Sequence, residues 1–211
     1  RFNFSNANMS NLFNGCEALK YIKFPKYNKF KGNIDNMFYA CISLSSLNLN
    51  NVDFSLTNSM ENLFFSCKSL TSLNLSNIDA TKVTNMNNMF YGCEKLKFLN
   101  LTNFITLSLT NMDSMFSECF SLISLNLNRI NTSLVQNMTY LFSQCMNLLS
   151  INLSNFNTSL VTSMKSMFKG CSSLTSIDLK NFNTSMVEDM EKMFYSCTSL
   201  TSLDLSNFNK S

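Results

Sequence analysis

Residues 167–187 read MFKGCSSLTSIDLKNFNTSMV, and this phrase decides the fold of the chain. It returns 26 residues later as MFYSCTSLTSLDLSNFN, at residues 193–209. Towards the N-terminus, its cysteine recurs at one interval of 25 residues and otherwise at intervals of 26. A fixed period of this length indicates a stacked repeat. The sequence therefore predicts one repeat domain over residues 1–211, a segment of a longer solenoid, with eight units marked by Cys16, Cys41, Cys67, Cys93, Cys119, Cys145, Cys171 and Cys197.

Large apolar residues lie at fixed distances from each cysteine. Phe always precedes it by three residues and Leu always follows it by three, while Met or Leu precedes it by four. In the first half of a unit the spacing i, i+3, i+4, i+7, i+10 is typical of one helix face, so we expect short helices such as residues 164–174. The second half ends in an alternation such as Leu203-Asp204-Leu205, which predicts a short strand.

The turns are built without the usual turn residues, because the chain has only Gly 4 and Pro 1. The segment Asn-Phe-Asn-Thr-Ser follows the predicted strand at residues 155–159 and 181–185, and close variants follow it in the units on either side. Asn tolerates turn conformations, and Ser or Thr can accept a hydrogen bond from the first N–H groups of a helix. We therefore expect this segment to supply both the turn and the helix cap.

The longer phrase M-F-x-x-C-x-S-L-T-S-L-D-L-S-N-F-N-T-S-x-V-x-x-M resembles that of the BspA-like leucine-rich repeat surface proteins, and it matches best at residues 167–187 and 193–209. The resemblance implies a cell-surface or secreted protein that binds partners or matrix and has no catalysis of its own. We therefore expect an α/β solenoid, a leucine-rich-repeat-like parallel stack with one short strand and one short helix in each 26-residue unit.

Composition excludes several classes of function. With His 0, the chain can form no Ser-His-Asp triad and no imidazole metal site, and it contains no glycine-rich phosphate-binding motif. A net charge of +3 is too small to indicate a nucleic-acid partner. No apolar run approaches the length of about 18 residues that a transmembrane helix needs. We expect no enzyme activity, no cofactor and no metal.

The cysteine column predicts packing instead of disulfide bonding. Neighbouring helices of a solenoid lie roughly 10 Å apart, whereas a disulfide needs Cα atoms about 4.4–6.8 Å apart. We expect reduced cysteines that act as small buried hydrophobic residues. A bound metal is disfavoured because no second ligand type recurs near the cysteines.

The outward positions of the predicted strands are the candidate partner surface. Five and seven residues after each cysteine from Cys41 onwards lie polar residues that stacked strands would align into two columns, with one aromatic residue among them. Two interpretations stay open, a surface that binds a partner and a sheet that is merely solvated. The candidate residues are Ser72, Asn74, Phe98, Asn100, Ser124, Asn126, Ser150, Asn152, Ser176, Asp178, Ser202 and Asp204.

Glycosylation motifs of the form Asn-x-Ser/Thr also recur, and we consider those in the strands and turns to be accessible. The candidates are Asn74, Asn100, Asn131, Asn152, Asn157, Asn183 and Asn209.

Two functions fit these features. The first is a non-catalytic extracellular or cell-surface scaffold that binds a protein or glycan partner. The alternative is a structural protein in which copies of the chain stack end to end into a fibre.

Overall fold

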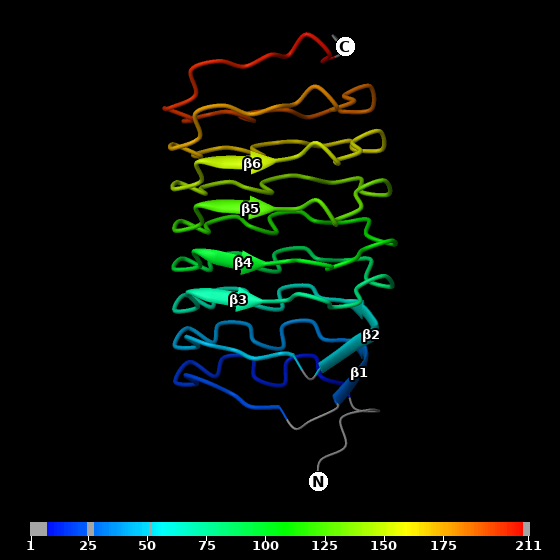
Figure 1. The fold of residues 1–211 in the computed structure, drawn as a ribbon, viewed down its shortest axis with the longest axis vertical. Coiled ribbons are helices and arrows are strands. Elements are labelled where there is room, and N and C mark those ends of the chain that lie inside the picture. Colours follow the sequence, from blue (N-terminus) through cyan, green and yellow to red (C-terminus); the bar gives the residue numbers. More distant parts are fainter. Residues whose placement is uncertain (1–7, 25–27, 51, 209–211) are drawn as a thin grey trace.

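The computed structural model describes residues 8–24, 28–50 and 52–208, and Figure 1 shows them as a stack of coils along one long axis. Each repeat unit completes one coil and lies directly on the coil of the unit before it. The first described unit and the last lie at opposite ends of the stack. A repeat of this kind buries its apolar side chains only between neighbours.

The strands are short and parallel, as the alternating pattern predicts. β3 (Ser72–Asn74) pairs with β4 (Phe98–Asn100), and β5 (Ser124–Asn126) pairs with β6 (Ser150–Asn152). The register joins equivalent residues of successive units, such as Leu125 and Ile151. β1 (Asn28–Asn33) and β2 (Val52–Ser59) form a longer parallel pair with two register shifts in the irregular first part of the stack.

The predicted helices are wrong, since the described residues form no helix. The segment from Met to Cys is a series of tight turns in which two residues of every unit, five and one before the cysteine, have a positive φ. A right-handed helix cannot include such residues, because all of its residues need a negative φ. The first set is Asn11, Asn36, Asn62, Asn88, Ser114, Tyr140, Ser166 and Lys192; the second is Gly15, Ala40, Ser66, Gly92, Glu118, Gln144, Gly170 and Ser196.

Because of these left-handed residues, every second backbone N–H group of the segment points towards the next unit and donates a hydrogen bond to it. Ser114, Phe116 and Glu118 donate to carbonyl oxygens of the following unit at 2.8–3.0 Å. The intervening residues donate within their own unit, as Ser117 does to Ser114 at 3.0 Å. In this way the turn segment meets its backbone hydrogen-bonding requirement without a helix.

The phenylalanine column forms a continuous stack through the core. Consecutive rings from Phe13 to Phe194 have centroids 5.4–5.8 Å apart and lie within 16° of parallel. In the inner units the ring is fully buried, as are the Met and Leu residues around it. Stacked rings add a specific attraction to the burial of their apolar surface.

The cysteines lie in this core as free thiols. From Cys41 to Cys171 they are fully buried, while Cys197 is half-buried and Cys16 is exposed. Each buried Sγ donates a hydrogen bond of 3.1–3.2 Å to the carbonyl oxygen of the Phe in the preceding unit. Burial raises the pKa of these thiols, to about 11 at Cys41 and about 12 at Cys171.

We expect Ala40→Gly to raise the free energy of unfolding by about 0.5–1 kcal/mol. Ala40 has a φ of 52°, and the left-handed conformation costs an L-residue roughly 1–2 kcal/mol, partly offset by the greater entropy of unfolded Gly. In a helix the same change would lower stability by about 1 kcal/mol. Urea denaturation measures the sign, and Ala80→Gly, at a fully buried alanine outside the left-handed positions, should be destabilising.

We also expect the protein to lose stability in alkali. The folded pKa of the buried thiols is raised above about 9, so from that pH upwards the unfolded chain releases protons that the folded chain retains. The free energy of unfolding should be level between about pH 6 and 8 and then fall by up to about 1.4 kcal/mol per pH unit for each thiol. Cys119→Ala should reduce this slope, and a curve that stays flat to about pH 10 would contradict the buried thiols.

Candidate interaction surface

The structure places the twelve predicted surface residues on one face of the stack. All are exposed, and they alternate with inward residues such as Leu73 and Leu125. Eight of them lie on β3 to β6, while the other four occupy the equivalent positions after Cys171 and Cys197, outside the named strands. The face is therefore continuous through the units from Cys67 to Cys197.

The column seven residues after the cysteine has a structural task. Each of its side chains accepts, through Oδ1, a hydrogen bond of 2.9–3.0 Å from the backbone N–H two residues further along. This bond turns the chain away from the strand. The residues with this role are Asn74, Asn100, Asn126, Asn152, Asp178 and Asp204.

The column five residues after the cysteine has no such task. No side-chain hydrogen bond of Ser72, Ser124, Ser150, Ser176 or Ser202 is found within the part of the chain that the structure describes. Phe98 interrupts this column, and its side chain is 65% exposed. The residues best placed to meet a partner are therefore the serines and Phe98.

Charge is distributed unevenly along the face. Near its C-terminal end, the backbone N–H and the ammonium group of Lys180 lower the pKa of Asp178, and the backbone N–H of Ser206 lowers that of Asp204. Both carboxylates are therefore ionised at neutral pH. Beside Phe98, by contrast, the exposed side chains are Lys95 and Lys97.

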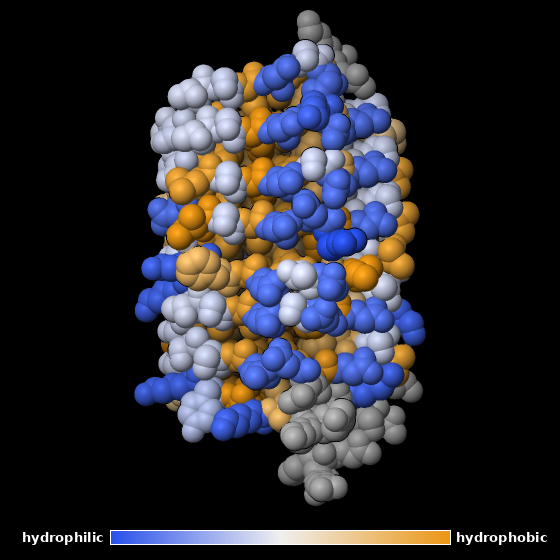
Figure 2. Space-filling model, viewed as in Figure 1, coloured by the Kyte–Doolittle hydropathy of each residue, from blue (hydrophilic) through white to orange (hydrophobic). Residues whose placement is uncertain are grey.

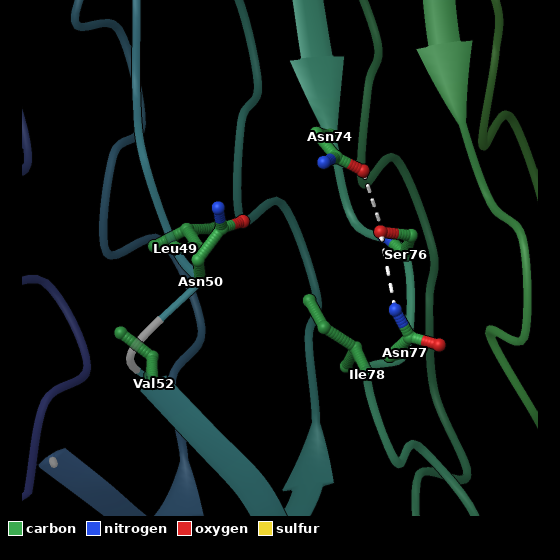
Figure 3. Close-up of a pocket in the computed structure, with 7 residues that line it drawn as sticks. All are labelled: Leu49, Asn50, Val52, Asn74, Ser76, Asn77 and Ile78. Carbon is green, nitrogen blue, oxygen red and sulfur yellow. Dashed lines mark hydrogen bonds between the residues drawn. The ribbon is translucent and has the colours of Figure 1, made fainter.

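A pocket of about 220 Å³ lies where the regular strands meet the irregular first part of the stack (Figure 3). Leu49, Val52 and Ile78 give it apolar walls, and Asn74, with three other polar residues, lines the rest. Asn74 Oδ1 accepts a hydrogen bond from Ser76 N, which fixes part of the lining. The sequence pointed to Asn74 but not to the other polar residues, Asn50, Ser76 and Asn77.

The glycosylation candidates that the structure describes are accessible to different degrees. Asn74, Asn100, Asn152, Asn157 and Asn183 are exposed, and Asn131 is half-buried. Each accepts a hydrogen bond through Oδ1 from the residue two positions on, which is the Ser or Thr of its own motif. Asn209 lies outside the described residues, and glycosylation at all seven sites stays a prediction.

Other classes of site are not found in the described residues. Within residues 8–24, 28–50 and 52–208, no group of three or more His, Cys, Asp or Glu side chains could hold a metal ion. In the same ranges there is also no helix with the length and apolar character needed to cross a membrane.

Comparison with known proteins gives one family match. The family described as "Mycoplasma protein of unknown function, DUF285" matches residues 7–123, 32–148 and 110–211. No protein with a curated function matches the sequence.

Solved structures show the same fold. A T. pallidum leucine-rich repeat protein, TpLRR, is 20% identical with a TM-score of 0.54, over 78% of this chain and 69% of that chain. A leucine-rich repeat protein from Eubacterium ventriosum is 17% identical with a TM-score of 0.56, over 87% of this chain and 45% of that chain. The chain thus spans less than half of the second protein. These similarities confirm the leucine-rich-repeat-like solenoid.

The strand-end hydrogen bonds predict unequal effects of substitution on an exposed face. Asn126→Ala removes the acceptor for the N–H of Asn128, at 3.0 Å, and should lower the free energy of unfolding by about 1 kcal/mol. Asn126→Asp keeps that oxygen, and Ser124→Ala removes no bond, so both should change stability by less than about 0.5 kcal/mol. Equal effects of all three in urea denaturation would contradict the structural task of this column.

Proposed function

This chain belongs to the family described as Mycoplasma protein of unknown function, DUF285. We propose that it is a non-catalytic scaffold of the cell surface that binds a protein or glycan partner through its strand face. The finer assignment to the BspA-like surface proteins is part of the proposal. It is supported by the phrase that begins at Met167 and returns at Met193.

The observation that carries this proposal is the aligned, exposed strand face. Its serine column is solvent-facing in successive units, and parallel strands place equivalent side chains about 4.8 Å apart. Such a regular surface can contact an extended partner at many points. The side chains on the opposite, inward side of the same strands are buried in the core, as Leu73 and Leu125 are.

One observation favours the alternative, in which copies of the chain stack into a fibre. Each inner unit presents N–H donors on one face and carbonyl acceptors on the other, as Phe116 donates to Leu141 at 3.0 Å and Phe142 donates to Met167 at 2.9 Å. Because the bonding is the same from unit to unit, units of two copies could pair through the same bonds.

The proposed function is tested by binding of the 211-residue chain to immobilised collagen, fibronectin and laminin and to a glycan array. We expect saturable binding to at least one of these ligands, reduced about tenfold or more when Ser124, Ser150 and Ser176 are changed to Lys. Leu134→Lys, Leu160→Lys and Met186→Lys together form the matched control, because these side chains are also exposed but lie outside the strand face.

Unchanged binding by the serine variant, or no binding to any of these ligands, would contradict the proposed function. Size-exclusion chromatography of the same sample addresses the alternative. Particles that grow with protein concentration would favour the fibre, whereas a discrete monomer would exclude it.

A further inference from the structure

One corner of the strand face departs from the repeat in three successive units. Four residues after the cysteine, where the chain enters the strand, half of the units carry Ser or Thr, namely Ser45, Thr71, Thr175 and Thr201. The units of Cys93, Cys119 and Cys145 carry Lys97, Ile123 and Leu149 there. Five residues after the cysteine, Phe98 replaces the serine of the neighbouring units. One residue after the cysteine, Met146 occupies the position that Ser172 and Thr198 occupy in the two later units.

These substituted side chains are exposed and lie in three successive units of the stack. The exposed fraction is 65% at Phe98, 36% at Ile123, 42% at Met146 and 54% at Leu149. The N–H of Leu149 donates to the carbonyl of Ile123 at 3.0 Å, so the two side chains start from directly paired backbone positions. We call Phe98, Ile123, Met146 and Leu149 the apolar corner.

The apolar corner is a bounded patch on the surface. In Figure 2 apolar residues reach the left edge of the strand face at the level of β4 to β6 and give way to paler, polar residues above and below. A contiguous patch of exposed apolar residues that is bordered by polar residues is a mark of an interaction site. The neighbouring units show that the fold itself does not require apolar residues at these positions.

Two cations border the apolar corner. Lys95 and Lys97 are exposed, and neither makes an ion pair among the described residues. The lysine of the preceding unit, Lys68, does have a partner, since its Nζ lies 2.8 Å from Glu94 Oε1. The border of the corner therefore offers positive charge that is not neutralised within the described structure.

We infer that the apolar corner, with Lys95 and Lys97, docks a protein segment that carries both apolar and acidic side chains. Apolar side chains of the segment would cover Phe98, Ile123 and Leu149, and its carboxylates would meet the two ammonium groups. This inference rests on the proposed function and names the part of the strand face and the partner chemistry. Two lysines contribute only about 2 kcal/mol at an anionic membrane, where polybasic sites use four or more, so the charges favour a protein.

The test uses the 211-residue chain and three synthetic peptides of about twelve residues, the length of a short recognition segment. One alternates Leu or Phe with Glu, the second replaces Glu by Lys, and the third replaces Leu and Phe by Ser. Fluorescence anisotropy should show binding of the first peptide only. Added salt should weaken that binding, because exposed charges are screened.

The main variant combines Phe98→Ser, Ile123→Thr and Leu149→Thr, which installs the residue types found in neighbouring units. Its circular dichroism and melting temperature should stay unchanged, while affinity for the acidic peptide falls about tenfold or more. Lys95→Ser with Lys97→Thr should also weaken binding and abolish most of the salt dependence. The matched control, Leu134→Ser, Leu160→Ser and Met186→Ser, removes similar apolar side chains from outside the strand face and should bind normally.

Four results would overturn the inference. These are equal binding by the main variant, equal binding of the basic peptide, no binding of any peptide, and binding of phosphatidylserine vesicles but not of the acidic peptide. The matrix and glycan assay separates this failure from that of the proposed function. If the serine variant loses matrix or glycan binding, the strand face remains a binding surface even when the corner docks no peptide.

Discussion

The hydrogen bond from one unit's backbone to the next is the interaction on which the rest of the structure depends. Phe116 donates to Leu141 in the next unit, and Ser114 and Glu118, two residues before and after it, make equivalent bonds. This bond requires the left-handed residues at 114 and 118, and it sets the distance at which the rings of Phe116 and Phe142 stack. The repeat period, which is 26 residues at every interval but the first, keeps all three features in register along the chain.

The repeat, its core and its strands follow from the sequence, but the helices do not. The turns, with a positive φ five residues and one residue before each cysteine, place apolar residues inward at nearly the spacing of a helix face. The apolar pattern therefore could not distinguish these turns from a helix. The only signal was at the left-handed positions, where Asn36, Asn62 and Asn88 and then Gly92 and Gly170 occur. Asn and Gly are the residues that adopt a positive φ at low cost.

The alternation of the strands was enough to locate the candidate surface. It was not enough to show that one of its two columns shapes the turns while the other is free to meet a partner. An exposed Asn126 and an exposed Ser124 look alike in the sequence, and only the bond from Asn128 shows that one of them shapes the turn. The apolar corner had a sequence signal that was missed. Ile123 and Leu149 are exceptions at a repeat position where other units carry Ser or Thr. The residue types shared between units drew attention only to Phe98.

The thiol bonds give the stack a direction. A unit's cysteine donates back to the Phe carbonyl of the unit before it, while that earlier unit donates its N–H groups forward. During synthesis, a completed unit therefore presents backbone N–H donors and the carbonyl oxygen of its Phe. The unit that emerges next supplies the carbonyl oxygens and the cysteine thiol that pair with them. The chain can add one coil at a time in the order in which the ribosome makes it, without waiting for distant residues.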